Sequence, residues 1–257
     1  MAHLALSYDL YVVDQRELLR ADLVNRLKDI NQFQGARYEV YVAASFVRAG
    51  FEVEPENEKD GKTSHCEFVA RHRSGAAYSV EAKSRHREGI LGRGGTATSF
   101  DAIVADASTL LVQALRKVAR HERIVFIDVN VPPHEEAVLK SDWFRRVASQ
   151  LKRLEETLKG SDALPPAFVF FTNHPYHYVS AETPEPGKSA VFTAIHNRDF
   201  KRGPDTGEEV PDAVGTAMRA VAAKYPALKE LSDSVFNHTQ IPQAFEGDDA
   251  WCPPGTF

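Results

Sequence analysis

The sequence predicts a single α/β domain over residues 1–257, and three observations predict this fold class. Segments with apolar residues at helical spacing alternate along the chain with short strand-like runs. One run, at residues 167–173, is almost entirely apolar, as expected for a buried strand. The length is sufficient for one large domain or two small ones, and no internal repeat or low-complexity segment stands out.

Two helices are predicted before the first strand. Residues 12–30 carry leucines on one stripe, with Asp14 as a plausible N-cap, which indicates a helix. A second helical segment covers residues 36–49, and Gly50 is a typical residue to end it.

A short strand and a hairpin follow these helices. The strand is expected at residues 51–55, and a polar connection leads to a hairpin at residues 66–85 that turns near Ser74 and Gly75. The basic, glycine-rich run at residues 85–99 is expected to be a mobile loop.

The remaining chain continues the same alternation up to its last ~25 residues, which look irregular. The expected elements are a helix at 101–121, a strand at 123–131, a helix at 142–159, strands at 167–173 and 189–195, and a helix at 212–225.

Composition excludes several classes of protein. The net charge of −5 argues against a polyanion binder held by bulk charge, although a local basic patch can still bind nucleic acid. No apolar run approaches the ~20 residues needed to cross a bilayer, and the N-terminus lacks the pattern of a signal peptide. The two cysteines, Cys66 and Cys252, form neither a disulfide framework nor a zinc pattern, so a reducing cytoplasm is expected.

A buried carboxylate is predicted on the second helix. On the helical wheel Glu39 falls between Ala43 and Phe46, inside an otherwise apolar arc. A carboxylate that faces a core costs several kcal/mol unless it is paired or bound to a metal. The alternative is that Glu39 reaches solvent or an arginine at the end of the helix.

The hairpin brings further charges to one place. Glu81 and Lys83 are two residues apart on a strand, so their side chains share a face. A three-residue loop at 74–76 would place Glu67 opposite Lys83, and a five-residue loop at 72–76 would place it opposite Glu81. An even loop would turn Glu67 to the other face, so convergence requires an odd loop.

These residue types suit phosphodiester hydrolysis. Three carboxylates, Glu39, Glu67 and Glu81, repel one another unless a cation lies between them. Mg²⁺ takes oxygen ligands, lowers the pKa of a bound water and neutralises charge on a phosphate. A lysine such as Lys83 can orient or deprotonate that water, or stabilise the pentavalent phosphorus.

The segments CEF at residues 66–68 and VEAK at residues 80–83 resemble the signature of the PD-(D/E)XK nuclease superfamily, which has the restriction-endonuclease-like fold. That family pairs an acidic residue on one strand with E-x-K on the next and often adds a glutamate from the preceding helix, the place of Glu39. The order helix, three strands, helix, strand over residues 33–130 is similar to its core. The resemblance leaves residues 131–257 as a C-terminal α/β elaboration.

The resemblance implies an Mg²⁺-dependent nuclease, with Mn²⁺ as a second metal and DNA as the first substrate. It also allows a homodimer, because cutting both strands commonly requires two active sites. The roles that it implies are metal ligands for Glu67, Glu81 and the carbonyl of Ala82, the catalytic lysine for Lys83, and a ligand or water holder for Glu39.

Two positions depart from the family pattern. Glu67 stands where the family usually has an aspartate, and Cys66 stands where it usually has a proline. The alternative for Glu81 and Lys83 is an exposed ion pair on a strand.

The helix after the hairpin carries a further candidate. Some branches of the superfamily place a glutamine from this helix near the site, and Gln113 would match. On the wheel Gln113 shares a face with Lys117 and Arg120, which would contact phosphates if the face is functional. The alternative is a solvated helix face.

The basic loop directly follows the proposed catalytic strand. Arg85, Arg87 and Arg93 lie in it among glycines, and such a segment would close over nucleic acid next to a metal site. The alternative is a surface loop without function.

The second function that the sequence allows is a catalytically silent protein on the same fold, acting as a nucleic-acid-binding or assembly subunit. A third is an α/β interaction protein without a site, which predicts an exposed Glu39.

Overall fold

The computed structural model describes seven ranges of the chain: residues 2–56, 65–86, 100–130, 142–157, 164–173, 189–195 and 212–222. Among the helices in these ranges, none has both the length and the apolar character that crossing a bilayer requires.

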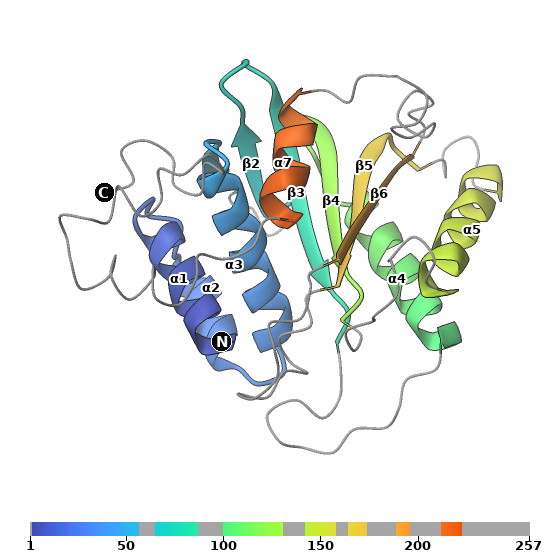
Figure 1. The fold of residues 1–257 in the computed structure, drawn as a ribbon, viewed down its shortest axis with the longest axis horizontal. Helices are drawn as coiled ribbons and strands as arrows, with labels where there is room; N and C mark the ends of the chain where they lie inside the picture. Colours follow the sequence, from blue (N-terminus) through green and yellow to red (C-terminus); the bar gives the residue numbers. More distant parts are fainter. Residues whose placement is uncertain are drawn as a thin grey trace.

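Six strands form one sheet: β1 (Glu52–Pro55), β2 (Phe68–Arg71), β3 (Ala77–Ser84), β4 (Glu122–Asp128), β5 (Ala167–Asn173) and β6 (Ser189–Ile195). Their order in the sheet is their order in the chain (Figure 1). Strands β1, β2 and β3 pair antiparallel, β3, β4 and β5 pair parallel, and β6 is antiparallel to β5. The α/β class that the sequence predicts is therefore confirmed.

The described helices are α1 (Ala2–Asp14), α2 (Ala21–Lys28), α3 (Phe33–Arg48), α4 (Phe100–Leu115), α5 (Asp142–Thr157) and α7 (Asp212–Ala222). They cover the sheet on both faces, with α1, α2, α3 and α7 on one side and α4 and α5 on the other (Figure 1). Helix α4 connects β3 to β4, as parallel neighbours require a crossover.

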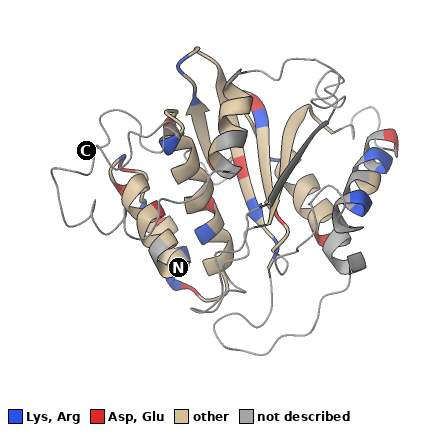
Figure 2. Cartoon of the chain, viewed as in Figure 1, with Lys and Arg blue, Asp and Glu red and all other residues tan. Residues whose placement is uncertain are grey.

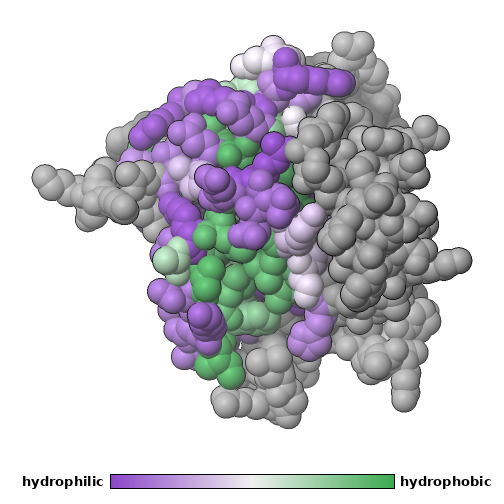
Figure 3. Space-filling view, turned by 90° about the vertical axis from the view of Figure 1, so that its left-hand side faces the viewer, coloured by the Kyte–Doolittle hydropathy of each residue, from purple (hydrophilic) through white to green (hydrophobic). Residues whose placement is uncertain are grey.

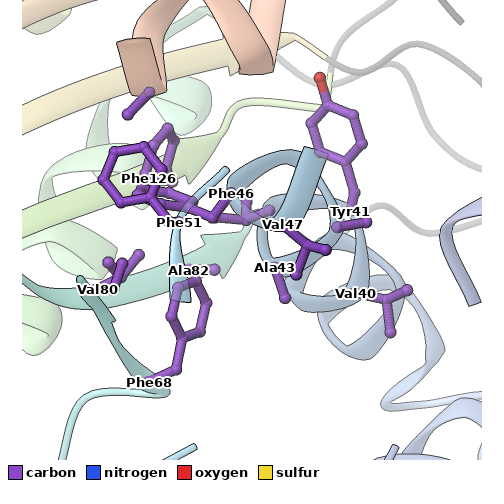
Figure 4. Packing of buried hydrophobic residues seen from close by; sticks show 14 of the residues in the cluster. Val40, Tyr41, Ala43, Phe46, Val47, Phe51, Phe68, Val80, Ala82 and Phe126 are labelled. Carbon is purple, nitrogen blue, oxygen red and sulfur yellow. The ribbon is translucent and has the colours of Figure 1, made fainter. Parts of the chain in front are cut away.

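Two hydrophobic cores lie on the two faces of the sheet. On β4, Ile124 and Phe126 belong to the core under α3, whereas Val125 and Ile127 belong to the core under α4. Figure 4 shows the packing of the first core, where Phe126 also stacks on Phe170 with ring centroids 4.7 Å apart. This alternation is the period of two that a strand imposes.

The same period divides strand β3 into an apolar and a polar face. Val80 and Ala82 pack in the core under α3. Ser79, Glu81 and Lys83 therefore point to the face that α4 covers. The tertiary structure must accommodate a carboxylate and an ammonium there, next to an apolar core.

The helix predicted at residues 12–30 is wrong, because the chain forms two helices with a turn between them. Asp14 is the last residue of α1 and not an N-cap. In the turn, Glu17 has a φ of 57° and the N–H of Leu18 donates to the carbonyl of Val13 at 3.0 Å. Leu18 is buried there, so the turn lets both short helices pack on α3.

A buried ion pair joins α1 to α3. Arg48 donates to Asp9 at 2.6 Å, and the guanidinium also lies 5.6 Å from the centre of the Tyr8 ring.

On the side of the molecule that lies at the left of Figure 1, apolar surface is bordered by polar residues (Figure 3). Tyr11 of α1 is among the exposed large apolar residues.

The predicted strands at residues 167–173 and 189–195 are confirmed without a shift at either end. The helix expected to continue to residue 121 ends at Leu115. The C-terminal elements belong to the same fold, because β5 and β6 extend the sheet and α7 packs on α3.

Candidate functional site

The hairpin has the odd loop that convergence of the charges requires. Strands β2 and β3 pair up to a five-residue loop at 72–76, and their register runs to the pair Phe68 and Val80. One position further, the register places Glu67 opposite Glu81, and the N–H of Glu67 donates to the carbonyl of Val80 at 3.0 Å. The two carboxylates therefore share a face, in the arrangement that the five-residue alternative predicts.

Two lysines lie against these carboxylates. The ammonium of Lys83 is 2.8 Å from Oε1 of Glu81 and 3.8 Å from Oε1 of Glu67. The ammonium of Lys117 is 2.9 Å from Oε1 of Glu81 and 3.1 Å from Oε1 of Glu67. Lys117 thus bridges the two carboxylates more evenly than the lysine of the strand does.

Glu81 is the most enclosed charge of the cluster. Its exposed fraction is 0%, so the Glu81–Lys83 ion pair is not the exposed strand pair that the sequence also allowed. Burial and the nearby Glu67 raise the pKa of Glu81 to about 7, although the two lysines act in the opposite direction. Within the described ranges, Oε2 of Glu81 has no hydrogen-bond partner, so one strong acceptor remains unused.

Glu39 approaches the same cluster from α3. It is 6% exposed and accepts a hydrogen bond from Arg26 at 2.6 Å. Burial and the carboxylate of Glu67 raise the pKa of Glu39 to about 8, and Arg26 offsets part of this effect. The expectation of a buried carboxylate is correct, and so is the alternative that an arginine reaches it.

A small cavity adjoins two of the carboxylates. Glu39 and Glu67 line it together with Arg20 and apolar side chains, and its volume is about 20 Å³. A water needs roughly 10–15 Å³ on this measure, so the cavity has room for a water or a small ion but not for a nucleotide.

The segment after α4 holds Lys117 over the sheet. Oγ of Ser79 accepts the N–H groups of both Arg120 and His121 at 3.2 Å, which ties this segment to β3. The N–H of Cys66 donates to the carbonyl of Val118 at 3.3 Å, which ties it to the start of the hairpin. These bonds fix the backbone of Lys117 above Glu67 and Glu81.

Three carboxyl groups and three basic side chains meet in the cluster. Glu39, Glu67 and Glu81 face the cations of Arg26, Lys83 and Lys117. Burial lowers the pKa of Lys117, but Glu81 and Glu67 raise it by more, so it lies above its ordinary value. Charged positions on the central strands and on the outer helices are visible in Figure 2.

The donor chemistry of the cluster fits Mg²⁺, which prefers carboxylate and carbonyl oxygens. Among the described residues, however, no three Asp, Glu, His or Cys side chains are grouped as a metal site would need. Lys117 lies between the two opposed carboxylates, and the unpartnered Oε2 of Glu81 is a free oxygen donor beside it. Ala82 lies on β3 between Glu81 and Lys83, where it pairs with Phe126 of β4, and its side chain packs in the core under α3.

The expectation for Arg85 is wrong. Its side chain is buried and its Nε donates to Asp106 of α4 at 2.7 Å, while its N–H donates to the carbonyl of Asp128. Arg85 therefore attaches the end of β3 to its neighbours and does not belong to a basic surface loop. Arg87 and Arg93 lie outside the described residues.

The predicted helix face with Gln113, Lys117 and Arg120 does not form, because α4 ends at Leu115 and only Gln113 lies within it. Gln113 is exposed and, within the described part of the chain, makes no hydrogen bond or ion pair with the cluster, as expected for a solvated face. Arg120 is also exposed, and its Nε lies 3.7 Å from Glu56. Lys117 leaves this face because α4 ends at Leu115.

Two parts of the cluster are not predicted by the sequence: Arg26 and the position of Lys117. Arg26 is one of several charged residues on α2, and nothing in its neighbours along the chain indicates that it contacts a residue of another helix. The role of Lys117 depends on the early end of α4. The sequence does not indicate this end, because residues 113–121 contain neither a proline nor a glycine.

Comparison with known proteins identifies no relative of this chain. No family profile, no curated protein and no solved structure matches it.

Proposed function

We propose that this protein is an Mg²⁺-dependent nuclease that hydrolyses phosphodiester bonds, with DNA as its first candidate substrate, on a restriction-endonuclease-like core. The observation that carries the proposal is the pairing of Glu67 with Glu81 across β2 and β3, with Lys83 2.8 Å from Glu81. The buried glutamate of the preceding helix, Glu39, completes the set of side chains that the sequence motif predicts.

Each residue has a defined task in this proposal. Glu67, Glu81 and the carbonyl of Ala82 would hold the metal, with Glu39 as a further ligand or as the residue that holds a water. A metal held there would supply a water of lowered pKa and would neutralise charge on the phosphate. Lys83 orients the attacking water or stabilises the charge that develops on the pentavalent phosphorus.

The direct test is cleavage by the purified chain. Linear, circular and single-stranded DNA, and RNA, are incubated with Mg²⁺, Mn²⁺ or EDTA, and products are separated on gels. We expect metal-dependent cleavage that EDTA stops. Conversion of a circular duplex to nicked or to linear product shows whether one active site or two act together.

Two variants test the assigned residues. Glu81→Gln removes a proposed ligand charge, and Lys83→Met removes the proposed catalytic ammonium, so each should reduce cleavage by about a hundredfold or more. Glu54→Gln is a matched control, because Glu54 is an exposed carboxylate of β1 outside the cluster. Unchanged cleavage by either test variant, with circular dichroism as for wild type, would contradict the mechanism.

A silent nucleic-acid-binding or assembly subunit is the second candidate function. The observation in its favour is that basic side chains already pair with the three carboxyl groups, namely Arg26 with Glu39, and Lys83 and Lys117 with Glu67 and Glu81. It predicts mobility shifts of nucleic acid that are equal in EDTA and Mg²⁺, with no cleavage of any substrate.

A further inference from the structure

We infer that Lys117 occupies the position of the divalent cation in the metal-free protein and that its ammonium leaves when the metal binds. The inference rests on the proposed metal site and adds a residue that the sequence motif does not contain. It assigns to Lys117 a positioning role, namely to hold Glu67 and Glu81 together until the cation replaces it.

The distances place the ammonium between the opposed carboxylates. Lys117 is 2.9 Å from Glu81 and 3.1 Å from Glu67, whereas Lys83 is 2.8 Å and 3.8 Å from the same two oxygens. A metal that binds both carboxylates needs the space between them. The Lys117 ammonium fills that space, because it lies within 3.1 Å of both carboxylates, whereas Lys83 lies close to Glu81 alone and can stay beside a bound metal. Charge repulsion at such short range further opposes a metal and the Lys117 ammonium between the same two carboxylates.

A second observation points to a ligand other than lysine. Glu81 is fully buried, yet its Oε2 has no hydrogen-bond partner among the described residues. Burying an unsatisfied carboxylate oxygen is costly, and both lysines lie against Oε1. A divalent cation with several open coordination positions can use the second oxygen as well as the first.

The side chain can leave while the backbone stays in place. Bonds from Ser79 and Cys66 hold the segment around Lys117, so its Cα is fixed. The lysine side chain is a flexible chain of four carbons, so its ammonium can move without the backbone. The side chain of Lys117 is 11% exposed, which gives the ammonium a route to solvent. Exchange therefore requires a rotamer change and no rearrangement of the sheet.

Calorimetric titration with Mn²⁺ and Mg²⁺ tests the exchange. Lys117→Met should bind metal about tenfold more tightly than wild type, or better, because no ammonium has to be displaced. The matched control is Arg116→Met, which removes an exposed cation one residue away and should leave the affinity nearly unchanged. Without metal, Lys117→Met should also unfold at a lower temperature than wild type, and saturating Mn²⁺ should remove most of this difference.

The wild-type protein provides a readout that does not depend on a variant. Lysines are acetylated with an amine-reactive ester in the presence and absence of Mn²⁺, and the modified peptides are quantified by mass spectrometry. Acetylation of Lys117 should rise several-fold with the metal, relative to the exposed Lys28. Unchanged acetylation of Lys117 at saturating metal would overturn the inference.

The outcomes separate this inference from the proposed function. Equal metal affinity of wild type and Lys117→Met, with cleavage intact, overturns the exchange and leaves the nuclease. Absence of metal binding in both proteins overturns both. Binding by Lys117→Met alone supports the lysine as occupant of the site and overturns the nuclease proposal for the wild-type chain. If the variant folds only with Mn²⁺, followed by circular dichroism, this also supports the exchange.

Discussion

Glu39 shows how a single charged residue can be correctly placed by its helical position and still depend on distant partners. Its place among apolar neighbours on α3 predicts burial, and the side chain is buried. Desolvation and Glu67 favour its neutral form, while Arg26 of α2 favours its ionised form. Its protonation therefore reports on the whole cluster.

The stability of the metal-free protein should fall as pH rises from about 5 to about 8. The pKa of Glu39 is about 8 in the folded chain and near 4.5 in the unfolded chain. Between these values the folded state keeps a proton that the unfolded state has lost, so the stabilisation present at low pH disappears as pH rises through 8. Glu81, with a pKa of about 7, acts in the same direction.

Urea unfolding in EDTA at several pH values measures this slope. Glu39→Gln should reduce the slope without abolishing it, because Glu81 remains. Glu54→Gln, on the exposed side of β1, should keep the wild-type slope. A slope of Glu39→Gln equal to that of wild type would mean that Glu39 is ionised in both states.

Among the elements, the β2–β3 hairpin decides which carboxylates meet. Its five-residue loop contains Gly75 with a φ of 88°, a conformation that residues with a Cβ rarely adopt. The loop sets the register, and a shift by one residue would move Glu67 to the other face. The conformational freedom of one glycine thus contributes to the position of the proposed site.

Replacing Gly75 by alanine should destabilise the fold by about 1–2 kcal/mol through backbone strain alone, because within the described ranges no heavy atom beyond the two chain neighbours lies within 4 Å of the added Cβ. Gly35 is the matched control, since it also has open space but lies in α3 with ordinary φ. Gly35→Ala should stabilise by about 0.5–1 kcal/mol. Urea unfolding distinguishes the two signs, and a loss of equal size for both variants would contradict the argument.

For the whole molecule, the C-terminal elements complete the core that carries the site. Strand β4 pairs with β5 over most of its length, and Phe126 stacks on Phe170. The second core also unites α4, β4 and β5. The boundary at residue 130, which the sequence resemblance indicates, therefore cuts through the packed interior.

A chain that ends at residue 130 should not fold cooperatively. It would expose the edge of β4 that pairs with β5 and remove Phe170, which stacks on Phe126, and unpaired apolar strand edges promote aggregation. Gel filtration and near-ultraviolet circular dichroism compare it with the full chain. A monomeric fragment with a native-like near-ultraviolet spectrum would show that the chain up to residue 130 folds without the C-terminal elements.

The sequence by itself determined the α/β class, most strands and the shared face of Glu81 and Lys83. These features follow from local periodicity, which depends on neighbouring residues only. It also limited the hairpin loop to odd lengths if the carboxylates were to converge, and the observed loop has five residues.

Only the tertiary structure decided that Glu67 lies opposite Glu81, that Arg26 reaches Glu39, and that Lys117 lies between the carboxylates. Each contact joins two different elements, from 13 residues apart for Arg26 and Glu39 to 50 residues apart for Lys117 and Glu67, and each depends on where a helix or turn ends. Helix ends are set by packing against other elements as much as by local propensity, which is why the broken N-terminal helix and the early end of α4 were not predicted.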